Sequence, residues 1–187
     1  MKRIYMPTIT VAILLLALTP SVFAQDTESD RSLRHKSVLI FRLSTFVTWP
    51  KNVFGKKNGP VLIGVLGSKQ IQKKLVEETK GASISGHPIK VVSISIDDKE
   101  QDWVKLHILF VDKSEAEKFI VLDKEKFRDA PILTFGDSDT FERDGGVIRI
   151  FLKNNKHKVS VNIDAAERKH LRINSRLLEF ADIVSDT

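Results

Sequence analysis

The sequence has 187 residues, a formal net charge of +6 and no cysteine. The absence of cysteine excludes disulfide bonds, thiol catalysis, thiolate metal sites and lipid attachment to an N-terminal cysteine. Lysines occur in clusters without aromatic platforms or a nucleic-acid motif, so we expect solvated faces and no nucleic-acid binding.

The first 24 residues have the pattern of a cleavable secretory signal. Lys2 and Arg3 form a basic start, an apolar run covers residues 9–18, and Ala24 stands at the expected cleavage site. A helix that spans a bilayer needs roughly 20 apolar residues, and this apolar run is only about half as long. We therefore expect export and cleavage after Ala24, and an uncleaved anchor is the alternative.

The remainder is long enough for one domain with a single core. Residues 25–32 are polar and rich in acids, which predicts a flexible N-terminus of the mature chain. The folded domain is expected to cover residues 33–187. No repeat or internal linker divides it.

A largely buried first helix is predicted near the start of this domain. Between Leu33 and Val47 the apolar residues fall mainly at three- and four-residue spacings. The pair Trp49-Pro50 is expected to end this helix, because proline pushes the preceding residue out of the helical region.

The next part of the chain alternates between apolar strands and helices. Buried strands are expected at residues 61–66, 89–96, 107–111 and 131–135. A helix is expected to follow the first strand, and another is expected to begin at Ser114. This order predicts an α/β fold with right-handed crossovers in a mostly parallel sheet flanked by helices.

The turn Gly67-Ser68 joins the first of these strands to its helix. Free amides at such a helix start could hold a phosphate or carboxylate, so Gly67 and Ser68 are candidate ligand-binding residues. The turn lacks the dinucleotide fingerprint and the Walker lysine. A tight turn with Ser68 as the helix cap is the other interpretation.

A C-terminal antiparallel hairpin is predicted to add edge strands. Residues 147–152 and 158–163 each alternate with a two-residue period, and Asn154-Asn155 between them suits a tight turn of undetermined length. Asp164 and Ser175 are expected to cap two helical pieces. The apolar residues expected to pack the last helix are Leu177, Leu178, Phe180, Ala181 and Val184.

No set of residues has the pattern of a catalytic or metal site. The five histidines are dispersed, and none stands beside an obvious nucleophile. In the acidic loop 137–144, Phe141 takes a ligand position of a calcium loop, so we prefer a solvated turn to a calcium site. We therefore expect no enzymatic activity, no cofactor and no metal.

Four residues in the C-terminal part are candidates for contact with a partner. Arg149, Arg172 and Arg176 could present a basic patch, although packing of the stem with a solvated head explains each of them alone. Asn162 could contact a partner or ligand, or its amide could cap the neighbouring backbone.

Several motifs in order resemble the YfiR-like family of periplasmic regulators over residues 36–184. They are Trp49-Pro50 after an apolar helix, VLIGVLGS, HILFV, PILTFGD, Gly145-Gly146, V-x-V-N-x-x-A-A and L-x-I-x-S-R-L-L-x-x-A. The chain departs from the family pattern at Val159, His170 and Asn174, where phenylalanine, glycine and serine are usual.

The resemblance implies a periplasmic α/β domain without enzymatic activity. Such a domain would bind the periplasmic sensor region of an inner-membrane diguanylate cyclase and repress it, which lowers cyclic di-GMP and biofilm formation. Redox control through disulfides, attributed to members of the family, cannot operate in a chain without cysteine. The alternative is a periplasmic small-ligand-binding module that signals to a membrane kinase or transporter, and a homodimer is also open.

Overall fold

A computed structural model describes residues 28–51, 53–55, 59–97 and 103–186. The expected signal peptide at residues 1–24 and its cleavage site lie outside these ranges. Within them the chain forms one α/β domain, as the sequence predicted.

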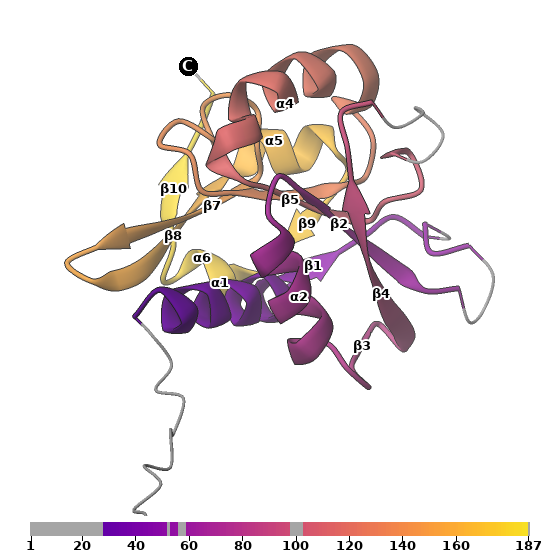
Figure 1. Cartoon of the computed structure of the whole chain (residues 1–187). Helices are drawn as coiled ribbons and strands as arrows, with labels where there is room; N and C mark the ends of the chain where they lie inside the picture. Colours follow the sequence, from indigo (N-terminus) through magenta and orange to yellow (C-terminus); the bar gives the residue numbers. More distant parts are fainter. Residues whose placement is uncertain (1–27, 52, 56–58, 98–102, 187) are drawn as a thin grey trace, which may run out of the picture.

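An eight-stranded, mostly parallel sheet forms the centre of the domain (Figure 1). Its strand order is β10-β8-β7-β6-β5-β2-β4-β3, and within this sheet, as far as the structure describes it, only the β7–β8 and β3–β4 pairs are antiparallel. The strands are β2 (Val61–Leu66), β3 (Ser83–Ile84), β4 (His87–Ile94), β5 (Ile108–Val111), β6 (Leu133–Gly136), β7 (Ile148–Lys153), β8 (Lys156–Asn162) and β10 (Asp182–Val184). A separate antiparallel pair joins β1 (Val47–Thr48) to β9 (Arg172–Ile173).

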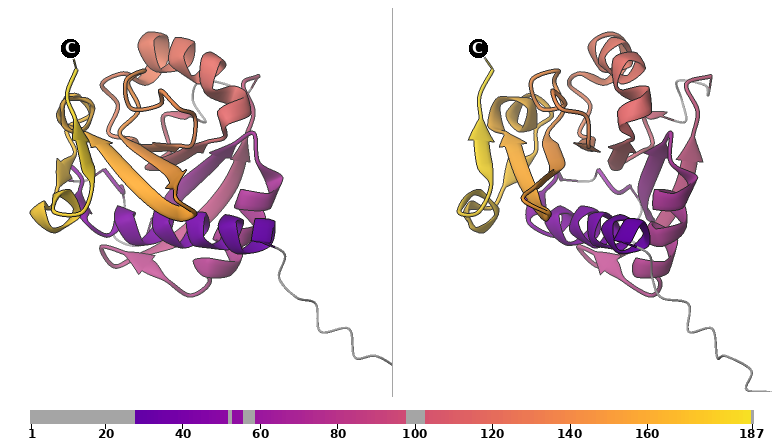
Figure 2. Two further views of the ribbon diagram at one scale, coloured as in Figure 1. Left: turned by 90° about the vertical axis from the view of Figure 1, so that its left-hand side faces the viewer. Right: turned by 60° about the vertical axis from the view of Figure 1, so that its left-hand side comes forward.

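Helices cover both faces of this curled sheet (Figures 1 and 2). One face carries α1 and α2, whereas α4 and the π-helical segment η2 lie over the other. The helical segments are α1 (Glu28–Ser44), α2 (Lys69–Glu78), η1 (Lys113–Glu115), α4 (Ala116–Leu122), η2 (Asp123–Phe127), α5 (Ile163–Arg168) and α6 (Ser175–Leu178).

The alternation of side chains along the strands produces two apolar clusters, one on each face of the sheet. In the first, Ile40 of α1 and Leu75 of α2 pack in one cluster with Phe110 of β5. In the second, Phe119 and Phe127 lie against the opposite side. Because the central strands are buried on both faces, their sequences are continuous apolar runs.

The first helix differs from the sequence prediction at both ends. It begins at Glu28 and so includes residues 28–32, which we expected to be flexible. It ends at Ser44 rather than at Trp49-Pro50, because Val47 and the next residue pair with β9 as a strand. A tertiary contact therefore overrides the helical spacing of the apolar residues in this segment.

The C-terminal hairpin is confirmed, and its loop consists of two residues. Asn154 and Asn155 have φ angles of 52° and 55°, the left-handed values that such a turn needs. The hairpin is not an edge, however, since β7 pairs with β6 and β10 covers β8. The prediction of edge strands was wrong because β10 is too short and irregular to be read from the sequence.

The last helix is also shorter than predicted. It covers only Ser175–Leu178, and its N-cap is Asn174, whose side chain accepts a hydrogen bond from the amide of Arg176. Leu177 is fully buried, but the side chain of Phe180 is 58% exposed. The helix ends early because the chain must turn to place β10 beside β8.

The loop between β6 and β7 is anchored by one aromatic side chain. Phe141 is buried between Gly136 and Gly146, and a Cβ atom on either glycine would lie 2.2 Å from its ring. The two glycines therefore allow a close approach that no other residue permits. This packing holds the acidic loop next to the start of β7.

Candidate functional site

Asn162 ends β8 and organises the start of α5. Its Oδ1 atom accepts a hydrogen bond from the amide of Ala165 at 2.8 Å, and its Nδ2 atom donates to the carbonyl of Glu142 at 2.6 Å and to Oδ1 of Asp186 at 2.8 Å. It is the cap that we had assigned to Asp164. Because its side chain is fully buried, Asn162 is a structural residue in this conformation and not an exposed partner contact.

Arg149 lies on β7 beneath the acidic loop. Its guanidinium donates to Glu142 at 3.3 Å and to Asp139 at 3.1 Å, and it stacks over Phe151 at 4.4 Å. The side chain is only 15% exposed. The guanidinium of Arg149 is thus bound within the domain, and little of its surface is accessible to a partner protein.

Arg172 and Arg176 are both exposed, in contrast to Arg149. Arg172 lies on β9 and Arg176 on α6, and neither makes an ion pair within the described residues. Phe180 and Ile183 follow in the same C-terminal segment, and their side chains are also largely exposed. The structure therefore separates the three candidate arginines into one internal residue and two surface residues.

Gly67 and Ser68 form the tight turn that the sequence suggested. Gly67 has a φ of +88°, and the Oγ atom of Ser68 accepts from the amide of Ile71 at 3.3 Å. A Cβ atom at Gly67 would approach Glu115 to 2.8 Å and Asp112 to 3.0 Å. Two acidic residues so close to the turn disfavour an anion there, which supports the capping interpretation.

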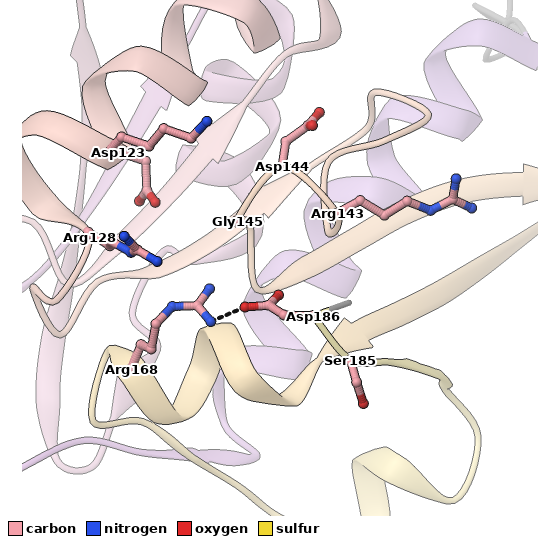
Figure 3. A pocket seen from close by; sticks show the side chains of 9 residues that line it. Asp123, Arg128, Arg143, Asp144, Gly145, Arg168, Ser185 and Asp186 are labelled. Carbon is pink, nitrogen blue, oxygen red and sulfur yellow. Dashed lines mark hydrogen bonds and ion pairs between the residues drawn. The ribbon is translucent and has the colours of Figure 1, made fainter.

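A polar pocket of about 320 Å³ lies elsewhere, and the sequence did not reveal it. Its walls come from η2 and the following residues, the loop at 143–145, the end of α5 and residues 185–186 (Figure 3). These segments are far apart in the chain and have no common motif. The pair Gly145-Gly146 was its only local signal, and we interpreted that pair as a turn.

A buried ion pair supports the wall of this pocket. The Nζ atom of Lys169 donates to Oδ1 of Asp123 at 2.7 Å and to the carbonyls of Phe127 and Arg128 at 2.9 and 3.1 Å. Burial lowers the pKa of Lys169, although Asp123 acts in the opposite direction. Lys169 thereby ties the end of α5 to the end of η2.

Asp186 is one of the residues that line the pocket. Its carboxylate accepts hydrogen bonds from Asn162 and from the guanidinium of Arg168, and its own amide donates to Asp164 at 2.7 Å. The hydrogen bond from Asn162 is the main reason that the pKa of Asp186 is lowered, and Arg168 adds to the effect. A carboxylate is therefore well accommodated at this position.

Four of the histidines lie in two pairs in the fold, although they are far apart in the sequence. The rings of His35 and His157 lie 5.9 Å apart, and Phe54 separates His87 from His107. Within the described ranges, no three histidine or acidic side chains gather as a metal site would require. The described helices also include none with the length and apolar character needed to cross a membrane.

Comparison with known proteins gives a family match and several solved structures with a similar fold. A model of the family described as YfiR/HmsC-like (DUF4154) matches residues 34–182. No curated protein sequence matches the chain.

Two of these solved structures illustrate the shared fold at low sequence identity. A conserved domain protein from Vibrio cholerae O1 biovar El Tor is 14% identical with a TM-score of 0.54, and the alignment covers 83% of this chain and 60% of that one. An ABC domain in complex with L-Trp from Streptococcus pneumoniae is 14% identical with a TM-score of 0.50, covering 81% and 62%. The chain thus spans less than two thirds of either neighbour.

Proposed function

This chain belongs to the YfiR/HmsC-like family, and from that premise we propose that it represses an inner-membrane diguanylate cyclase by binding its periplasmic sensor region. Membership in the family supports the broader assignment of a periplasmic regulator rather than an enzyme. The observation that carries the proposal is the family match over residues 34–182, which includes nearly all of the described fold.

The proposed mechanism is a population shift of the cyclase. A bound protein holds the cyclase inactive only if it has a higher affinity for the inactive state. A preference of about 100-fold, or about 2.7 kcal/mol, would move a balanced equilibrium to nearly full repression. Loss of the regulator would then raise cyclic di-GMP.

We place the contact on the C-terminal surface, defined as the exposed residues Arg172, Arg176, Phe180 and Ile183 of the C-terminal segment. Interfaces are enriched in arginine and aromatic residues, and this segment exposes both. The neighbouring strand β10 has no partner on its outer side among the described strands. Arg149 and Asn162 would support this region from inside the domain rather than contact the cyclase.

Export is part of the same proposal. A chain that regulates a periplasmic sensor region must reach that compartment, and residues 1–24 have the composition of a secretory signal. We propose cleavage after Ala24, which would leave Gln25 as the first residue of the mature protein.

A second candidate function is a periplasmic ligand-binding module that signals to a membrane kinase or transporter. The polar pocket of about 320 Å³ favours it, because that volume lies within the range of small-molecule sites. The Streptococcus pneumoniae neighbour is in complex with L-Trp, so a protein of this fold can bind a small molecule.

A pull-down from solubilised membranes tests the proposal. We expect the mature protein to retain a diguanylate cyclase and the double variant Arg172→Ala with Arg176→Ala to lose it, because truncating an arginine in a buried pair costs about 2–5 kcal/mol. The matched control is Lys153→Ala with Lys156→Ala, which removes the same charge from the exposed end of the hairpin.

Each outcome separates the alternatives. If the arginine variant, with an unchanged circular dichroism spectrum, still retains the cyclase, the C-terminal surface is not the contact. If the wild type retains a kinase or a transporter and no cyclase, the ligand-binding module is the better account.

A further inference from the structure

The polar pocket has an excess of unpaired positive charge. Among the described residues, Arg128 and Arg143 line it without making an ion pair. The carboxylates of its walls are already engaged, since Asp123 is held by Lys169 and Asp144 accepts from Thr140 at 2.6 Å. The guanidinium groups of Arg128 and Arg143 are therefore not held in ion pairs, although the carboxylates of Asp144 and Asp186 line the same pocket.

Two arginine side chains of the pocket point toward the carboxylate of Asp186 (Figure 3). Arg128 and Arg168 point toward the centre, where the carboxylate of Asp186 lies, whereas Arg143 extends away from it (Figure 3). Gly145, which has a φ of +100°, contributes backbone without a side chain at the opposite wall. The space between Arg128 and Arg168 is thus arranged around a small anionic group.

A buried donor is built into the same position. Asn162 is fully buried, and its Nδ2 atom reaches Oδ1 of Asp186 at 2.8 Å. Hydrogen bonds to the amide of Ala165 and the carbonyl of Glu142 fix the orientation of this side chain, so its remaining donor cannot turn toward solvent. It presents one donor to whatever acceptor occupies the pocket, and in this structure that acceptor is a carboxylate oxygen.

The side chain of Asp186 can be displaced from its position at the pocket. It follows the last strand by two residues, and both it and Ser185 are exposed. Short exposed segments next to an edge strand open at low free-energy cost. An external anion could therefore replace this carboxylate without unfolding the domain.

We propose that the pocket binds a small molecule carrying a phosphate or carboxylate group, which bridges Arg128 and Arg168 and displaces Asp186. Arg168 and the amide of Asn162 exchange the aspartate oxygens for those of the ligand, and Arg128 adds a second guanidinium. Guanidinium groups suit both oxyanions, because their planar donors match two oxygens at once. The volume of about 320 Å³ suits a small molecule and not a folded partner.

The test uses calorimetric titration of the mature chain at constant ionic strength, with inorganic phosphate and succinate as separate probes. We expect saturable binding of at least one probe, and the tighter of the two identifies the group that the pocket prefers. Arg128→Ala should weaken binding by about tenfold, whereas Arg143→Ala, which removes the same charge from a side chain directed away, should change it by less than about twofold.

Asp186→Asn tests the competition directly. This variant keeps the shape of the side chain and removes its charge, so we expect the affinity for the anion to rise by roughly three- to tenfold. Thermal unfolding of each variant confirms that the domain is intact.

Three results would overturn the inference: no binding of either probe at about 10 mM, equal weakening by the two arginine variants, or no gain in affinity for Asp186→Asn. Because the titration needs only the purified chain, failure here leaves the proposed repression of a cyclase untouched. Conversely, if the pull-down retains no cyclase, the proposed anion site is unaffected.

Discussion

Lys169 and Asp123 form a fully internal ion pair, with 2.7 Å between Nζ and Oδ1, although 46 positions separate them in the chain. The pair joins α5 to η2, and its remaining donors satisfy two carbonyls at the end of that π-helical segment. Removal of one partner from a buried pair leaves an uncompensated charge, which is far more costly than removal of both.

We predict that Lys169→Met lowers the unfolding free energy by about 3–5 kcal/mol, because Asp123 is left buried and unpaired. The double variant Asp123→Leu with Lys169→Met should recover a large part of that loss. Urea denaturation of the wild type, the single variant and the double variant measures both effects. An equally destabilised double variant would show that the pair is not the source of the cost.

The last helix gives a second prediction. Leu177→Ala should lower stability by about 2–5 kcal/mol through lost burial and a residual cavity, because Leu177 is fully buried. Phe180→Ala, at a largely exposed position two residues beyond the helix, should change it by less than about 1 kcal/mol. Equal effects in a denaturant titration would mean that the C-terminal segment is packed differently.

Asn162→Ala removes a cap and two donated hydrogen bonds from a buried position. We expect a loss of about 1–3 kcal/mol, since the carbonyl of Glu142 and the amide of Ala165 lose their partner. The control is Asn174→Ala, which removes the exposed cap of the four-residue α6 and should cost about 1 kcal/mol or less. If the control is the more destabilising of the two in chemical denaturation, the role given to Asn162 is wrong.

His107 should make stability depend on pH. Its Nδ1 atom accepts a hydrogen bond from the amide of Leu62 at 3.0 Å, and burial lowers its pKa from the ordinary 6.5. The unfolded chain therefore takes up the proton first, so stability has its full value above pH 6.5 and declines as the pH falls from 6.5 through the folded-state pKa. Burial also lowers the pKa of His157, which adds to the same decline.

His107→Asn should reduce this pH dependence, because it removes the buried imidazole whose pKa is lowered. Denaturation midpoints between pH 5 and pH 8, the interval in which ordinary histidines titrate, measure the difference. The same slope in the His107 variant and the wild type would assign the pH dependence to other groups.

The elements that the sequence predicted correctly depend on local chemistry. The tight turn at Asn154-Asn155 follows from the tolerance of asparagine for positive φ angles, and the buried strand at 61–66 follows from an uninterrupted apolar run. Ser68 caps α2 as proposed, because its side chain reaches an amide three residues ahead.

The features that the sequence did not reveal depend on contacts between distant segments. Val47 has helical spacing but becomes a strand because Ile173 pairs with it. The sequence assigned the cap of α5 to Asp164 and left a capping role for Asn162 open, and the structure gives the cap to Asn162, whose Oδ1 atom accepts from the amide of Ala165. The pocket combines four segments, none of which carries a motif for ligand binding.

The most direct test of the central claim is the level of cyclic di-GMP in cells that contain the partner cyclase. Deletion of the gene should raise it, the wild-type gene should restore the low level, and the variant with Arg172→Ala and Arg176→Ala should fail to do so. Quantification by mass spectrometry gives the result for all three strains. An unchanged level of cyclic di-GMP after deletion, in every growth condition in which the cyclase is present, would contradict the account.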